Sequence, residues 1–158
     1  MNAGNAPDPN RVEPDNFPAE DLIAELGKDK TVGLVGEFPF ASALKQKVGT
    51  LHLFELKPVS GALARDQWEE VLPRLEILAL TGTTLLTRHM AWYLSRATRA
   101  KIIILGPTTP ASPTLFEFGA DYLCGSVVTD TGRVSASIRA DLCFKDIKKN
   151  GGIIFTRG

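Results

Sequence analysis

The sequence predicts an α/β fold of the Rossmann-like, doubly wound class, with a mainly parallel sheet of five or six strands. Three observations predict it. Short, almost purely aliphatic segments recur along the chain, and residues 102–105 form an uninterrupted aliphatic run. Segments with the apolar spacing of a helix separate these strands, and Gly, Pro, Ser and Thr gather where the strands end. Unbroken apolar strands alternating with helices are typical of a parallel sheet covered on both faces.

The aliphatic segments give five predicted strands. They cover residues 31–35, 51–56, 76–80, 101–105 and, more weakly, 122–124. Because crossovers between parallel strands are right-handed, we expect the spatial order 3-2-1-4-5, with strands numbered along the chain. A sixth, closing edge strand is expected at residues 153–155.

Helices are predicted between the strands from apolar spacing and from residues that start or stop helices. Pro18 and the acidic residues after it open the first helix, and Gly27 ends it. The clearest apolar stripe belongs to residues 84–98. The remaining predicted helices cover residues 41–48, 66–72 and 113–118, with a last helical stripe formed by Ala140, Cys143, Phe144 and Ile147.

Length and composition indicate one domain. The chain has 158 residues, of which 44% are hydrophobic, enough for a single core. Residues 1–17 lack periodicity and are interpreted as a flexible leader or linker, so the Rossmann-like domain is expected to cover residues 18–158. A formal net charge of +0 argues against nucleic acid or a membrane surface as a partner.

The N-terminal residues contain no apolar stretch typical of a signal peptide, which predicts a cytoplasmic protein with reduced cysteines. No two Cys or His residues lie two to four positions apart, so a zinc-type site is not expected. His52 and His89 are interpreted as structural or solvated, and Cys124 and Cys143 as core residues. Neither a Ser-His-Asp nor a Cys-His order is recognisable, so the sequence does not decide whether the protein is an enzyme.

A ligand site is expected beyond the carboxyl ends of the strands, where open parallel sheets bind ligands. The loops that follow the first four strands expose backbone amides and hydroxyls, which suit a polar ligand. The candidate ligand-binding residues are Gly36, Glu37, Phe38, Glu55, Thr81, Thr83, Thr84, Gly106, Pro107, Thr108 and Thr109.

Two of these loops have competing interpretations. Glu55 lies about 20 residues beyond Gly33 and Gly36, where an acid binds ribose hydroxyls in dinucleotide folds, but the Gly-x-Gly-x-x-Gly pattern is incomplete. A solvated carboxylate at a strand end explains Glu55 equally well. The prolines of the 106–113 loop make a rigid turn around Thr108 and Thr109. A plain connection to a helix needs neither threonine, which favours a functional turn.

Several motifs together carry a resemblance to one family. They are VGEFPF at 35–40, FELKP at 54–58, LTGTTL at 80–85, LGPTTPASP at 105–113, LFEFG at 115–119 and GSVVTD at 125–130. From about residue 28 onward the chain resembles the Rossmann-like domain of the family described as "putative heavy-metal chelation". The resemblance implies a domain that follows a smaller domain shaped like the enolase N-terminal domain, and a role in handling metals or corrinoids. Family members often carry His at the position of Glu37 and an amide or acid at that of Thr87.

Three interpretations of function remain open. In the first, a switch-point pocket binds a small polar ligand that is metal-bearing or heteroaromatic, and the cofactor is unknown. In the second, the chain is an interaction module that completes a site with an N-terminal domain or a second copy, with an apolar surface patch near the helix that carries Trp92 and Tyr93 as its sign. In the third, Glu55 marks a nucleotide or S-adenosylmethionine binder.

Two further expectations follow, one from the predicted strand order and one from the lack of clustered metal ligands in the sequence. We expect Gly36, Phe38, Glu55, Thr83, Thr108 and Thr109 to converge on one cavity, because the first and fourth strands would be neighbours. We also expect no tightly bound metal, because the chain lacks a Cys or His cluster.

Overall fold

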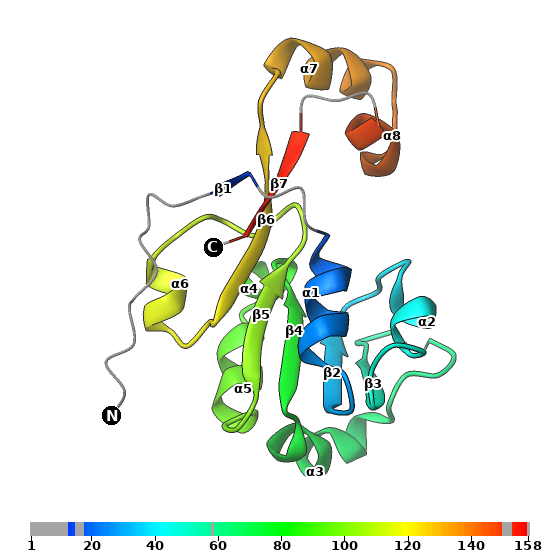
Figure 1. The fold of residues 1–158 in the computed structure, drawn as a ribbon, viewed down its shortest axis with the longest axis vertical. Helices are drawn as coiled ribbons and strands as arrows, with labels where there is room; N and C mark the ends of the chain where they lie inside the picture. Colours follow the sequence, from blue (N-terminus) through cyan, green and yellow to red (C-terminus); the bar gives the residue numbers. More distant parts are fainter. Residues whose placement is uncertain (1–12, 15–17, 58, 150–152, 158) are drawn as a thin grey trace.

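The computed structural model describes residues 13–14, 18–57, 59–149 and 153–157. Its centre is a sheet of five parallel strands, shown in Figure 1. They are β2 (Thr31–Val35), β3 (Thr50–Phe54), β4 (Ile77–Thr81), β5 (Lys101–Leu105) and β6 (Tyr122–Val128). Each coincides with a predicted strand to within a few residues, and the α/β class with a parallel sheet is confirmed.

The predicted strand order 3-2-1-4-5 is wrong. The strands lie in the order β3-β2-β4-β5-β6, which is 2-1-3-4-5 along the chain. The reason is burial. The first four residues of β4 are completely buried, so β4 lies inside the sheet, whereas β3 exposes Thr50 and half-exposes His52 and therefore lies at the edge of the parallel part. The direction of the strand order consequently reverses between β2 and β4. β2 pairs with β4, and the predicted pairing of β2 with β5 does not occur.

Two antiparallel strands extend the sheet beyond β6, which gives it seven strands. β7 (Ile153–Arg157) pairs with β6, and β1 (Glu13–Pro14) pairs with β7. β7 confirms the strand expected at 153–155, but β1 and not β7 forms the edge. β6 runs to Val128, beyond its predicted end, because β7 supplies partners for residues 124–128. Glu13–Pro14 fall in the predicted leader, and the rest of 1–17 lies outside the described residues.

Helices cover both faces of the sheet (Figure 1). The described helices are α1 (Ala19–Leu26), α2 (Ala41–Leu44), α3 (Trp68–Val71) between the 3-10 turns η1 (Arg65–Gln67) and η2 (Leu72–Arg74), α4 (Thr83–Leu86), α5 (Met90–Arg96), α6 (Thr114–Glu117), α7 (Thr131–Arg139) and α8 (Phe144–Lys149). α7 and α8 do not cover a face but lie beyond the parallel strands, at the top of Figure 1. One core cluster packs α1 and α2 on one face, and a second packs α3, α5 and α6 on the other. Within the described part of the chain, every helix is too short or too polar to cross a membrane.

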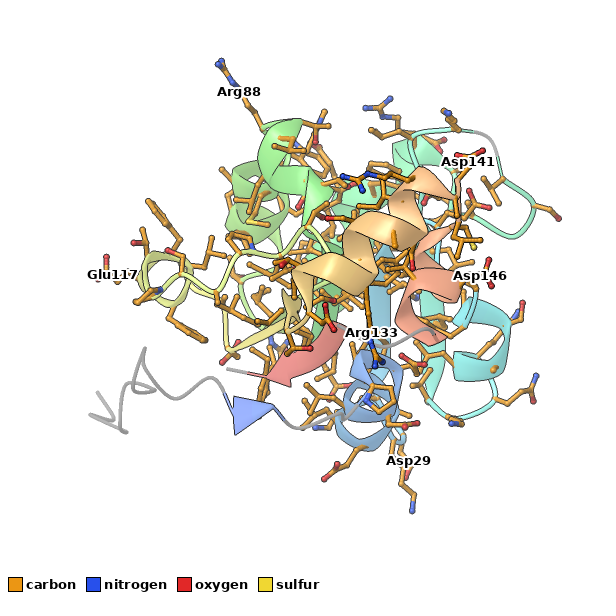
Figure 2. The ribbon with its side chains drawn as sticks, turned by 90° about the horizontal axis from the view of Figure 1, so that it is seen from above. Asp29, Arg88, Glu117, Arg133, Asp141 and Asp146 are labelled. Atoms are coloured by element: carbon orange, nitrogen blue, oxygen red, sulfur yellow. The ribbon has the colours of Figure 1, made fainter. Side chains whose placement is uncertain are left out.

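The helix predicted over residues 84–98 is interrupted. Arg88 has a φ of 59°, a left-handed conformation that ends α4, and its side chain points away from the body in Figure 2. His89 then forms the N-cap of α5. α7 was not predicted, because its sequence is rich in Ser, Arg and Gly. It is started by Asp130, whose Oδ1 accepts a hydrogen bond from the backbone N–H of Arg133 at 2.9 Å.

Candidate functional site

A cavity of about 430 Å³ lies at the carboxyl ends of β2, β3 and β4, where the strand order reverses. Its wall combines predicted and unpredicted residues. The predicted ones are Gly36, Glu37, Glu55, Thr81, Thr83 and Thr84. The unpredicted ones include Thr87, His89 and Tyr93, which come from the interrupted helix. We call this cavity the switch-point pocket.

The other predicted site residues do not line this pocket. Phe38 stacks on Phe40, with ring centroids 5.1 Å apart, and packs against the core cluster of α1 and α2. The loop with Gly106, Pro107, Thr108 and Thr109 lies behind Gly82, where a Cβ would come within 2.8 Å of the Thr109 nitrogen. The expected convergence of Phe38, Thr108 and Thr109 with Glu55 is therefore wrong, because it assumed that β2 and β5 are neighbours.

The carboxylate of Glu55 is one of the polar groups in the wall of the switch-point pocket. It follows β3, and its Oε1 is buried without a hydrogen-bond partner. Burial raises the pKa of Glu55 above its ordinary value of 4.5, and the nearby Glu37 carboxylate raises it further, while the backbone N–H of Leu56 and the charge of Lys57 act in the opposite direction. A buried acceptor without a donor costs free energy, which a ligand with N–H or O–H groups would recover.

The threonine turn after β4 forms the opposite wall. The hydroxyls of Thr81 and Thr83 lie 3.1 Å apart, and the hydroxyl of Thr84 donates to the carbonyl of Thr81 at 2.7 Å. Gly36, with a φ of 111°, lets the chain turn away from β2 beside this wall, since a Cβ there would lie 2.9 Å from Thr81 Cγ2. The turn thus offers fixed hydroxyls toward the pocket.

His89 and Tyr93 close the pocket on the α5 side. The Nδ1 of His89 is buried and has no hydrogen-bond partner. Tyr93 is only 2% exposed, and burial raises its pKa to about 12, so its phenol keeps the proton at neutral pH. The sequence predicts a structural or solvated His89, because it predicts an unbroken helix there and no Gly or Pro signals the break at Arg88.

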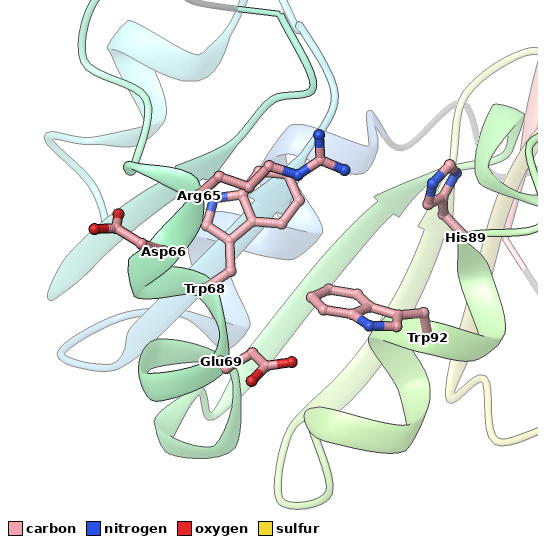
Figure 3. A pocket seen from close by; sticks show the side chains of 6 residues that line it. All are labelled: Arg65, Asp66, Trp68, Glu69, His89 and Trp92. Atoms are coloured by element: carbon pink, nitrogen blue, oxygen red, sulfur yellow. The ribbon is translucent and has the colours of Figure 1, made fainter.

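His89 also lines a second cavity, of about 440 Å³, together with Arg65, Asp66, Trp68, Glu69 and Trp92 (Figure 3). We call it the tryptophan cleft. Trp92 and Tyr93 do not themselves form an apolar surface patch, because Tyr93 is buried and the Arg96 guanidinium lies 4.2 Å from the centre of the Trp92 ring. The apolar surface near their helix, α5, is a groove on another side that includes Met90 and Leu94. The most exposed large apolar side chains in the described residues are Leu86 and Phe118, at 79% and 70%.

The described residues do not fit a metal held by the protein alone. They contain no group of three or more His, Cys, Asp or Glu side chains that could hold an ion. Glu37, Glu55 and His89 line the switch-point pocket but do not form such a group. The absence of tightly bound metal stays a prediction. We expect elemental analysis after dialysis to find no stoichiometric zinc, nickel or cobalt, and a stoichiometric ion would contradict it.

The profile of one family matches residues 19–157. The chain belongs to the DUF364 family. The description of DUF364 is "Putative heavy-metal chelation". An uncharacterised protein of Methanocaldococcus jannaschii is 27% identical over 141 residues, which are 83% of this chain and 54% of that protein.

Two solved DUF364 structures, both of proteins with unknown function, have the same fold. The one from Desulfitobacterium hafniense matches with a TM-score of 0.74 and 27% identity over 92% of this chain and 58% of its own. The one from Pyrococcus horikoshii matches with a TM-score of 0.77 and 18% identity over 96% and 61%. The chain thus spans little more than half the length of these DUF364 relatives.

The raised pKa of Glu55 predicts a pH-dependent stability. Because the folded chain holds the Glu55 proton more tightly than the unfolded chain, ionisation opposes folding as the pH rises from 4.5 through the folded pKa. Glu55→Gln cannot ionise, so we expect it to raise Tm by about 1–3 °C at pH 7.5 and to leave it unchanged at pH 4. The check is thermal unfolding at both pH values.

The matched control is Glu25→Gln, which removes a carboxylate from an exposed position on α1. Its effect on Tm should be equally small at pH 4 and at pH 7.5. A Glu55→Gln variant that is less stable than the unsubstituted chain at pH 7.5 would show that the carboxylate braces the fold.

Proposed function

We propose that this chain binds a small neutral or cationic molecule with adjacent hydrogen-bond donors in the switch-point pocket, such as a compound with a nucleoside part. The observation that carries the proposal is the buried, unpartnered Oε1 of Glu55. Glu55 directly follows β3, the strand beside β2, which is the position from which an acid binds the two ribose hydroxyls in dinucleotide-binding folds. A carboxylate that accepts two O–H groups there would gain charge-assisted hydrogen bonds.

The residues after β2 disfavour a phosphate in the same pocket. Glu37 directly follows Gly36 and would repel an anion. The helix that follows, α2, has only four residues, and Phe38 and Pro39 stand where a dinucleotide fold has glycines. We therefore favour a nucleoside or an S-adenosylmethionine-like cation over a nucleotide.

The family description suggests a ligand that carries a metal. In this pocket the ligand itself would have to supply most of the atoms that coordinate the metal. The pocket would then contribute Glu55, the threonine hydroxyls and His89 as hydrogen-bonding groups around it. We infer a cytoplasmic protein, because the chain has only two cysteines, whereas small secreted domains are usually rich in disulfides.

A second candidate function is a contact with another domain or a second copy of the chain. An apolar groove of about 270 Å³ lies between α4, α5 and α6 and includes Met90, Leu94 and the exposed Phe118. Exposed apolar surface of this kind marks contact sites in many proteins. The greater length of the relatives is consistent with a partner domain.

Adenosine is the probe for the first proposal. We expect a titration of the ¹⁵N-labelled chain to shift the backbone amide signals of Gly36, Glu55 and Thr83 in a saturable manner. Glu55→Gln should weaken this binding at least about tenfold, since hydrogen bonds to a charged group contribute about 1.5–3 kcal/mol. Adenosine monophosphate should bind more weakly than adenosine because of Glu37.

The ligand control is 2′,3′-dideoxyadenosine, which has the same base and lacks both hydroxyls. It should bind to the unsubstituted chain about as weakly as adenosine binds to the Glu55→Gln variant. Equal affinities of adenosine for the variant and the unsubstituted chain, or no saturable shift, would remove the support for this function. Glu117→Gln, at an exposed position on α6, controls for the loss of charge.

A further inference from the structure

The tryptophan cleft has a rigid aromatic wall. The rings of Trp68 and Trp92 have centroids 6.2 Å apart at an angle of 54°, and the Trp68 indole N–H donates to the carbonyl of Leu63 at 3.1 Å. Phe54 and Tyr93 support the Trp68 ring from the core, with centroids 5.5 Å and 5.9 Å away. Trp68 is only 3% exposed, and the Arg96 guanidinium lies 4.2 Å from the centre of the Trp92 ring, so the aromatic surface offered to a planar ligand is the part of Trp92 that Arg96 leaves uncovered.

One positive charge, that of Arg65, points into this cleft without an ion-pair partner among the described residues. Its guanidinium lies 5.3 Å from the centre of the Trp68 ring. In Figure 3 it extends over the space between Trp68 and His89. A guanidinium on an aromatic surface binds a carboxylate with two parallel hydrogen bonds.

The two acids that line the cleft do not cancel this charge. Glu69 is paired with Arg96, whose Nη2 lies 3.4 Å from its Oε1. The carboxylate of Asp66 points away from the space between Arg65 and His89 in Figure 3. The cleft therefore combines an aromatic wall with an available cation.

We propose that the tryptophan cleft binds a planar aromatic carboxylate, with its ring against Trp92 and its carboxylate on Arg65. His89 lines both this cleft and the switch-point pocket, and its Nδ1 lacks a partner. The two cavities are thus two halves of one site, one for hydrogen-bond donors at Glu55 and one for a planar anion at Arg65. The claim that the two cavities form one site rests on the proposed function. The claim that the cleft binds a planar aromatic carboxylate does not.

Nicotinate is the probe, because it is a planar aromatic carboxylate, and nicotinamide is its neutral counterpart. The chain has two tryptophans, and both lie in the cleft, so their indole N–H signals in ¹⁵N spectra report on it directly. Trp92→Phe identifies the signal of each ring. We expect nicotinate to shift the Trp92 signal in a saturable manner and nicotinamide to bind at least about tenfold more weakly.

Arg65→Gln should reduce the affinity for nicotinate to that for nicotinamide. Arg74→Gln is the matched control, because Arg74 is exposed, pairs with Glu70 at 3.1 Å and does not line the cleft. No saturable shift of Trp92, or an equal affinity of the Arg65 and Arg74 variants for nicotinate, would overturn the proposal. Glu55→Gln should leave nicotinate binding within about twofold, so a failed adenosine test and a failed nicotinate test are separate results.

Discussion

Phe54→Ala is expected to lower the free energy of unfolding by about 3–5 kcal/mol, the range found for large aromatic residues removed from a core. Phe54 is fully buried at the end of β3. Its ring meets Trp68 and Tyr93 edge to face, with centroids 5.5 Å and 6.3 Å away. Because it also lines the switch-point pocket, the cavity left behind would loosen the site itself. Chemical denaturation measures the loss.

Phe118→Ala is the control for this prediction. Phe118 is 70% exposed in the C-cap of α6, so the same substitution should change stability by about 0.5 kcal/mol or less. Equal losses for the two variants would mean that the cluster around Phe54 does not carry the stability of the fold.

The second large effect is expected at Gly82. An added Cβ would lie 2.8 Å from the backbone nitrogen of Thr109 and 2.9 Å from the carbonyl carbon of Thr108. These are backbone atoms, so the contact cannot be relieved by rotating a side chain, and the 106–109 turn must move away from the threonine turn. We expect Gly82→Ala to destabilise the chain by about 1–3 kcal/mol, as overpacking of a close contact does.

Gly132→Ala provides the comparison, since Gly132 lies in the first turn of α7 and the neighbour of an added Cβ is the Asp130 Oδ1 at 3.3 Å, a contact that a shift of a few tenths of an ångström relieves. Alanine favours a helix over glycine, so this variant should be neutral or slightly more stable. Thermal unfolding of both variants measures the difference. A Gly82→Ala variant as stable as Gly132→Ala would show that the two turns are not packed as described.

The strands could be predicted from the sequence because burial on both faces leaves an unbroken aliphatic pattern, as in β4 and β5. Their order could not be predicted from the same pattern. The sequence does contain one signal of the order, the polar residues Thr50 and His52 in β3. Both are partly exposed in the structure, and polar residues of this kind indicate that β3 lies at the edge of the parallel part and the fully apolar β4 inside it. The pairing of β7 with β6 depends on contacts distant in sequence, which periodicity does not report.

The sequence predicts the site residues that follow the ends of strands, such as Glu55 and the threonine turn. It does not predict the site residues that reach the pocket through a break inside a helix. Arg88 adopts a left-handed conformation without a Gly or Pro to signal it, and only this break puts His89 at the start of α5, between the two cavities. The sequence predicts Trp68 within a helix, Arg65 just before it and Trp92 on a helix near an apolar patch, but it does not predict the cleft, because a cleft forms only when α3 and α5 pack side by side.

The pairing of β1 with β7 has a consequence for the order of folding. It joins Glu13 to Arg157, residues from opposite ends of the chain, whereas β2 to β6 form from neighbouring segments. Closing so long a loop costs entropy that few hydrogen bonds recover, so this edge should form after the parallel body. The edge strands should also be the first to open in the native protein, and their amides should exchange hydrogen faster than those of β4 and β5.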